Sequence, residues 1–188
     1  SSNVLVTFNA CEADDPTREK MRVDMIEPYR TLLGHFRHES AHHFWTVLVT
    51  DLPAFRQVFG DERQDYQQAM DRHYREGAPP DWRERGFISA YASMHPWEDW
   101  AESWAHYLHM HDTLQTSLEF GFGRPGAESF EDMVQDWSRL TFALNSINRS
   151  MGISDLYPFV LGEVVLEKLR WIHRLLKGPP PSLAKLAE

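Results

Sequence analysis

Residues 27–49, EPYRTLLGHFRHESAHHFWTVLV, constrain this chain more than any other segment. Their apolar side chains recur at intervals of three and four, which predicts one long helix with a single buried face. Asp51 and Pro53 follow at once and predict that the helix ends there. The fold must therefore bury a helix that is also unusually rich in histidine. The positions that make up the expected apolar face are Leu32, Leu33, Phe36, Ala41, Phe44, Trp45 and Leu48.

Within this segment, HESAH has the spacing H-E-x-x-H. On a helix, His38 and His42 lie one turn apart with Cβ atoms about 5–6 Å from each other, so both imidazoles can bind one zinc ion. Glu39 is rotated by about 100° from His38, which lets its carboxylate act as a base toward a water on the metal. The motif alone arises by chance too often to establish a site, and a catalytic zinc needs a third protein ligand.

Residues 95–110, HPWEDWAESWAHYLHM, predict a second long helix with Pro96 in its first turn. Glu98 and Glu102 lie one turn apart on it, which matches the layout of glutamate zincins. We expect Glu98 to be the third zinc ligand and Glu102 to orient a ligand histidine, because a metal-bound imidazole usually donates its other N–H to a carboxylate. The reverse assignment of the two glutamates stays open. An apolar stripe expected in the core comprises Trp97, Trp100, Ala101, Trp104, Ala105 and Leu108.

Hydrolysis of an amide also needs a donor that stabilises the developing oxyanion. His106 lies four residues after Glu102 on the same face and is our candidate for this catalytic role, with a packed histidine as the alternative. His35 and His43 are expected to be surface or packing residues. Other candidates for the donor, among which the sequence does not choose, are Tyr91, Tyr107, Tyr157 and Arg149.

The rest of the chain predicts mainly α structure (α+β), with a short strand or small sheet at residues 3–9. Residues 87–93 are interpreted as an extended segment. We expect one zincin-like domain over residues 1–177 and a flexible Pro-rich tail over 178–188. Further helices are predicted at residues 61–77, 128–150 and 160–176.

Net charge, cysteine count and the length of apolar runs argue against several classes of protein. The formal net charge is -9 and no basic run is present, which argues against nucleic acid as a partner. A single cysteine, Cys11, excludes an internal disulfide and a cysteine-based zinc finger, and it fits a cytoplasmic location. No apolar run reaches the roughly 18 residues of a membrane span, so we expect no membrane association. The oligomeric state cannot be read from these features.

Several segments together resemble the Peptidase_Mx family of zinc-binding metallopeptidases, which belongs with the gluzincin type. They are EADD, EPYRTLLGHFRHESAHHFW, HPWEDWAESWAHYLH and NRSMGISDLYPFVL, and the resemblance covers nearly all of residues 4–176. It implies Zn²⁺ bound by His38 and His42, Glu39 as catalytic base, a glutamate of EDWAE as third ligand, and a peptide or protein substrate. Family members often carry an N-terminal cysteine zinc ribbon, which this chain lacks.

The expected function is therefore zinc-dependent hydrolysis of peptide bonds, with a zinc-bound water activated by Glu39. Two alternatives remain. A zinc hydrolase acting on a small amide would use the same residues, and a non-catalytic binding module would use zinc only to tie its helices together. Glu39 argues against the second alternative, because a structural zinc site needs no base and usually closes with four protein ligands.

Overall fold

The structure, a computed structural model, describes residues 13–24, 30–124, 126 and 129–178. Those residues form helices and turns and contain no strand, so the expected predominance of helix is confirmed. The strand predicted at residues 3–9 lies outside them, as do residues 179–188 of the predicted tail. The helical elements are α1 (Asp15–Asp24), α2 (Leu32–Leu48), α3 (Leu52–Phe59), α4 (Tyr66–Glu76), η2 (Tyr91–Ser93), α5 (Pro96–Glu119), α6 (Phe130–Ser150) and α7 (Glu163–Lys177).

One short helix was not predicted and one local prediction is wrong, each for an identifiable reason. Asp51 and Pro53 do end α2, but they also start α3, which we did not predict. The Asp51 carboxylate accepts the Ala54 N–H at 3.0 Å, and Pro53 lies in the first turn, so the stop signal is also a helix cap. Residues 87–93 are turns and the short helix η2 rather than an extended segment, because the Ser89 hydroxyl accepts the Ala92 N–H at 3.0 Å and closes the chain on itself.

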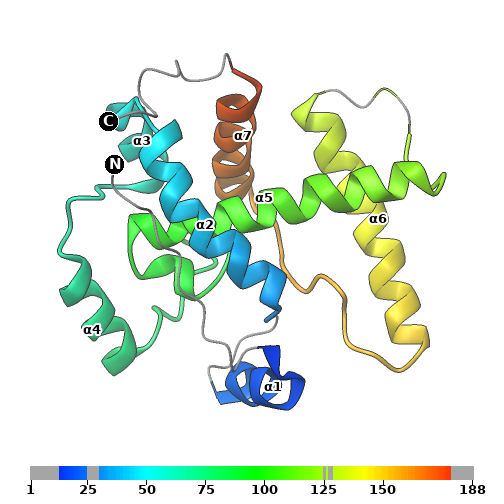
Figure 1. The fold of residues 1–188 in the computed structure, drawn as a ribbon, viewed down its shortest axis with the longest axis horizontal. Coiled ribbons are helices and arrows are strands. Elements are labelled where there is room, and N and C mark those ends of the chain that lie inside the picture. Colours follow the sequence, from blue (N-terminus) through cyan, green and yellow to red (C-terminus); the bar gives the residue numbers. More distant parts are fainter. Residues whose placement is uncertain (1–12, 25–29, 125, 127–128, 179–188) are drawn as a thin grey trace.

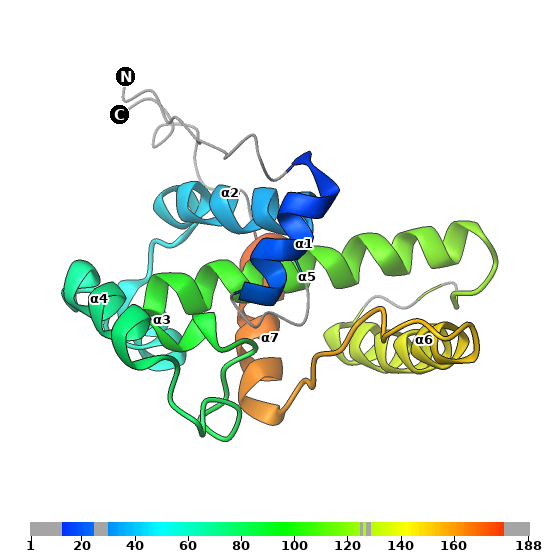
Figure 2. The same cartoon turned by 90° about the horizontal axis from the view of Figure 1, so that it is seen from below.

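Helix α5 runs through the middle of the molecule and is longer than predicted, ending at Glu119. Helix α2 crosses it on one side, while α6 and α7 lie on the other (Figures 1 and 2). The most extensive contact between two elements is that of α2 with α5. Across the described residues, no helix combines the length and the apolar composition that a membrane crossing requires.

Small residues allow α2 and α5 to approach closely where they cross. Ala41 of α2 and Ala101 of α5 are fully buried, and the Trp100 indole N–H donates to the Ala41 carbonyl oxygen at 2.9 Å. This bond fixes the position of α2 along α5. Around the crossing, Trp100 packs against Phe55 of α3 and Trp171 of α7, with ring centroids 6.4 and 5.9 Å away. The core position predicted for the α5 stripe is confirmed for most of its residues, whereas Trp97 is only partly buried and lines a pocket.

The apolar face expected for α2 is only partly correct. Leu33 and Phe36 expose 54% and 53% of their surface, whereas Arg37 is buried. The reason lies in the facing part of α5, which presents polar groups. Arg37 Nη1 donates to His109 Nδ1 at 2.8 Å, and its other terminal nitrogen forms an ion pair with Asp112. A charged side chain with two such partners is therefore buried in place of an apolar one.

A buried ion pair joins α7 to the start of α5. Lys168 Nζ lies 2.7 Å from Asp99 Oδ2, and both residues are almost fully buried. The same ammonium group donates to the Gly86 carbonyl oxygen at 2.6 Å and lies 4.5 Å from the ring centroid of Phe87. Burial raises the pKa of Asp99 to about 7, although the charge of Lys168 opposes the rise. The pair therefore holds the first turn of α5 against α7.

We expect Lys168→Met to lower the free energy of unfolding by about 3–5 kcal/mol, because it leaves the Asp99 carboxylate buried without its cation. Urea denaturation followed by circular dichroism measures the change. Lys177→Met, on the same helix but exposed, is the matched control and should change stability by less than about 0.5 kcal/mol. Equal effects of the two substitutions would contradict this role for the ion pair.

Candidate metal centre

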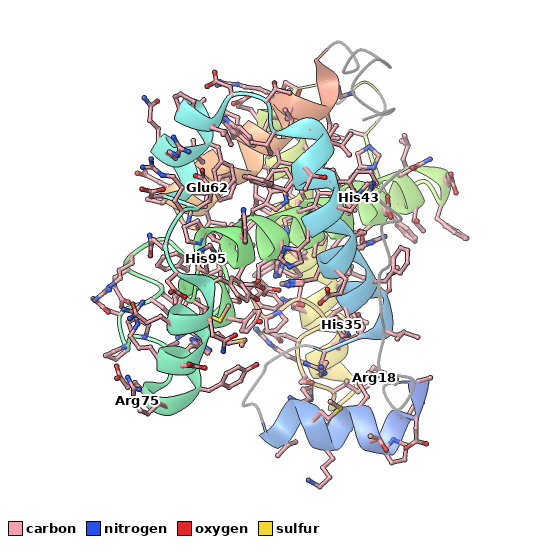
Figure 3. All side chains as sticks on the ribbon, turned by 60° about the vertical axis from the view of Figure 1, so that its left-hand side comes forward. Arg18, His35, His43, Glu62, Arg75 and His95 are labelled. Atoms are coloured by element: carbon pink, nitrogen blue, oxygen red, sulfur yellow. The ribbon has the colours of Figure 1, made fainter. Side chains whose placement is uncertain are left out.

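The first turn of α5 is fixed by His95, which is buried and caps the helix. Its Nδ1 accepts the Trp97 N–H at 3.1 Å, so its Nε2 carries the proton and donates to the Gln64 carbonyl oxygen, also at 3.1 Å. Figure 3 shows His95 at this junction between the start of α5 and the chain that leads into α4. Glu98 therefore sits in a rigid first turn, where the helix dipole favours a carboxylate.

Three predicted ligand residues converge beside this turn. His38 Nε2 lies 3.0 Å from Glu98 Oε2, and His42 Nε2 lies 3.6 Å from Glu98 Oε1. The nitrogen and oxygen atoms that the three side chains offer all lie within 4.8 Å of one another. Among the described residues, no other set of three or more His, Cys, Asp and Glu side chains meets in this way.

The geometry of this cluster fits zinc. Ligand atoms at about 2.0–2.1 Å from a tetrahedral zinc ion lie about 3.3 Å apart, close to the separations of Glu98 from both imidazoles. Two histidines and one carboxylate are also the donor set of catalytic zinc sites that keep one position open. Burial lowers the pKa of His42, so at pH 7 its imidazole is neutral, which is the form that binds a metal.

His38 is held on its other side by Glu102. Its Nδ1 lies 2.7 Å from Glu102 Oε1, and the Ser89 hydroxyl donates to Glu102 Oε2 at 2.6 Å. Burial alone would lower the pKa of His38, but the hydrogen bonds with Glu102 and Glu98 raise it. The two carboxylates thus stabilise positive charge at this point. Glu98 reaches the Nε2 atoms of both histidines, whereas Glu102 contacts only the Nδ1 side of His38.

Glu98 has a further partner that sequence reasoning missed. The Tyr66 hydroxyl, at the start of α4, donates to Glu98 Oε1 at 2.9 Å. Burial alone would raise the pKa of Glu98, yet the hydrogen bond with His38, the charge of His38 and the bond from Tyr66 lower it. Glu98 is therefore an ionised carboxylate with 1% of its surface exposed, held from three directions.

Glu39 lies beside the cluster without joining it. Its Oε1 is 3.2 Å from His35 Nε2, one turn earlier on α2. This hydrogen bond lowers the pKa of Glu39, and burial only partly opposes the effect, so the side chain is a carboxylate at pH 7. His35, expected to be a surface or packing residue, lies on the part of α2 that faces α1 (Figure 3) and contacts Glu39.

A pocket of about 390 Å³ opens at the cluster. Glu39 and the three clustered side chains line it together, and aromatic side chains complete its wall. One of these is Tyr91 of η2, whose ring centroid lies 5.9 Å from that of His38. A concave site that combines a candidate metal cluster with an ionised carboxylate has the arrangement needed for general-base hydrolysis.

The structure separates the candidates for an oxyanion donor. His106 does not line this pocket; it is buried, its Nδ1 lies 2.8 Å from the Tyr157 hydroxyl, and burial lowers its pKa to about 4. Tyr107 bonds His173 at 3.0 Å, and Arg149 pairs with Asp155. Of all the candidates named from the sequence, Tyr91 lines the pocket.

Comparison with known protein families agrees with the interpretation of this cluster as a metal site. A family model described as "Putative zinc-binding metallo-peptidase", Peptidase_Mx, matches residues 1–175. The chain belongs to this family. The match includes α2 and α5 entirely, so the residues that cluster around Glu98 lie within the region that the family model matches. The resemblance inferred from the sequence segments is confirmed.

Curated relatives of the chain are similar in sequence but carry no functional name. An uncharacterized protein of Mycobacterium bovis and one from each of two strains of Mycobacterium tuberculosis are 47% identical to it over 193 residues. The alignments cover 96% of this chain and 56% of each relative, so the chain spans just over half the length of these proteins. No solved structure matches the chain.

We expect His38→Ala and Glu98→Gln to lower the affinity for zinc more than 100-fold, because the first removes a donor nitrogen and the second replaces an anionic carboxylate by a neutral amide. Glu102→Gln should lower it about 10–100-fold, as is usual for a partner that only orients a ligand. Competition with a chelator of known affinity measures these values. Glu119→Gln, at the exposed end of α5, is the control and should be neutral. A larger loss in Glu102→Gln than in Glu98→Gln would reverse the assignment of the two glutamates.

Proposed function

We propose that this chain is a zinc-dependent metallopeptidase domain that hydrolyses peptide bonds. The observation that carries the proposal is the convergence of His38, His42 and Glu98 in a pocket that Glu39 also lines. We assign the three converging residues as ligands, Glu39 as catalytic base, and Glu102 as the carboxylate that orients His38. Membership of Peptidase_Mx supports zinc as the metal and a peptide or protein as the substrate.

In the proposed reaction, the metal and the side chains of this chain have separate roles. When bound, zinc would polarise the scissile carbonyl and acidify the attacking water. Glu39 accepts a proton from that water as its oxygen bonds the carbonyl carbon, and it returns the proton to the amide nitrogen as the C–N bond breaks. The products are a carboxylate and an amine. The hydrogen bond with His35 lowers the pKa of Glu39 and so keeps this pocket-lining carboxylate ionised.

Tyr91 is our candidate for the oxyanion donor in place of His106. Its ring lies beside His38 in the pocket wall, and burial raises the pKa of its hydroxyl, so the hydroxyl keeps its proton at pH 7. Tyr66 also lines the pocket, but its hydroxyl donates to the buried Glu98 carboxylate. The Tyr91 hydroxyl is hydrogen-bonded to Tyr66, a neutral partner, from which it can turn toward the developing charge. A neutral donor aimed at the developing charge is the group that such chemistry requires.

The proposal covers the domain and not the longer proteins related to it. We assign residues 1–177 to the zincin-like catalytic domain. Hydrolysis of a small amide by the same groups, or a module that only binds zinc, would be distinguished by the experiments below.

We expect Glu39→Gln to keep zinc affinity within about threefold of the wild type and to lower peptide hydrolysis at least 100-fold, because it removes the base and leaves the ligands in place. Cleavage of a quenched fluorescent peptide library, beside a zinc titration, measures both. Glu76→Gln, exposed on α4, is the control. Retention of more than half the activity in Glu39→Gln would contradict the proposed base.

We expect Tyr91→Phe to lower kcat about 100- to 1,000-fold with little change in KM, because the hydroxyl acts only on the charge that develops in the reaction. Steady-state kinetics on one cleaved peptide measures the split. Tyr107→Phe removes a hydroxyl bonded to His173, away from the pocket, and should leave kcat unchanged. A loss of kcat in His106→Asn but not in Tyr91→Phe would restore His106 as the donor.

A further inference from the structure

The pocket beside the candidate metal centre has two chemically different parts. Along α2, its lining passes from His38, Glu39 and His42 to Trp45 and Thr46. Trp97, from the first turn of α5, lines the pocket as well. Its volume of about 390 Å³ exceeds what a single scissile peptide group needs, so space remains beside the aromatic wall.

The aromatic wall is held rigidly by the core. The rings of Trp45 and Trp97 meet edge to face with centroids 5.5 Å apart, and Trp45 contacts the fully buried Phe55 at 5.6 Å in the same manner. Tyr66 packs on Trp97 at 6.2 Å from the other side. A wall built of interlocked rings is preformed, so a ligand that fills it does not have to order these side chains.

The distance between the two parts matches one residue of a bound peptide. Trp45 follows His42 by three positions on α2, which corresponds to about 4.5 Å along the helix axis. An extended peptide advances about 3.3 Å per residue, and its side chains stand away from the backbone. A peptide that runs along α2 with its scissile group at His38, His42 and Glu98 would therefore place the side chain of a flanking residue against Trp45.

The lining favours an uncharged side chain. Among the described residues that form it, none is Lys or Arg, so an acidic side chain at the aromatic wall would lie near the Glu39 carboxylate without a cationic side chain to pair with. A lysine side chain would lose its hydration against the indole rings and would lie close to the metal charge. A branched aliphatic or aromatic side chain gains free energy from burial on the same surface.

We propose that this aromatic subsite selects substrates with a bulky apolar residue, such as Leu or Phe, next to the scissile bond. The inference rests on the proposed function and names its substrate class. Thr46 lies at the exposed edge of the subsite, where its side chain can be replaced without disturbing the core. Thr50 is exposed one residue beyond the cap of α2 and does not line the pocket, which makes it a matched position for control.

The test measures binding without turnover. N-acetyl amino-acid hydroxamates, whose head group binds zinc, are titrated into the zinc-loaded wild type by calorimetry, with side chains of Leu, Phe, Ala, Asp and Lys. We expect the Leu and Phe compounds to bind at least tenfold more tightly than the other three. In Thr46→Lys this advantage should fall below threefold and the Asp compound should gain affinity, while Thr50→Lys should behave as the wild type.

Other outcomes separate the subsite from the peptidase assignment. Affinities of the Leu, Phe and Ala compounds within twofold of one another, or tightest binding of Asp or Lys, would overturn the subsite. Selective binding of the Leu and Phe compounds, with no peptide of a diverse library cleaved, would support the subsite and overturn the peptidase assignment. Cleavage of the library without preference for apolar residues would support the proposed peptidase activity and overturn the proposed selectivity of the subsite. No zinc-dependent binding of any hydroxamate would overturn both.

Discussion

The crossing of α2 over α5 is the constraint on which the rest of the molecule depends. Ala41 and Ala101 let the two backbones approach, and the bond from the Trp100 indole to the Ala41 carbonyl fixes how far along α5 helix α2 lies. His38 and His42 flank Ala41 on α2, and Glu98 flanks Trp100 on α5. A slip of either helix by one turn would move an imidazole by about 5.4 Å and separate it from the carboxylate.

The electrostatics of the crossing are those of a cation site. Glu98 is buried and ionised, and Glu102 holds the far side of His38, so two carboxylates converge on one imidazole. Burying such charges is costly unless positive charge and hydrogen bonds compensate for lost hydration. Tyr66 and Ser89 supply hydrogen bonds, and Zn²⁺, when bound as proposed, would supply positive charge. Asp99, the residue after Glu98, forms a buried ion pair with Lys168 of α7, and this pair anchors the same turn of α5.

Helical periodicity and H-E-x-x-H spacing were enough to predict α2, α5 and the one-turn pairs of side chains on each. That Glu98 of α5 meets His38 and His42 was predicted from the layout of glutamate zincins and not from spacing. Spacing succeeds within each helix, because two side chains one turn apart on the same helix form a local pattern. The partners that come from turns could not be found in this way: Ser89 lies in a segment interpreted as extended, and Tyr66 begins a charged helix. The position of His106 likewise follows from Tyr157, which is distant in sequence and packs against it. Contacts between elements far apart in the chain have no spacing rule to reveal them.

The most direct test of the metal centre is a crystal structure of the zinc-loaded domain with anomalous diffraction data collected at the zinc absorption edge. We expect one anomalous peak at about 2.0–2.2 Å from His38 Nε2, His42 Nε2 and the Glu98 carboxylate, with no fourth protein ligand. That result would establish an open zinc site beside Glu39. A peak elsewhere, no peak, or a fourth side chain that closes the coordination would contradict the account of this chain as a zinc hydrolase.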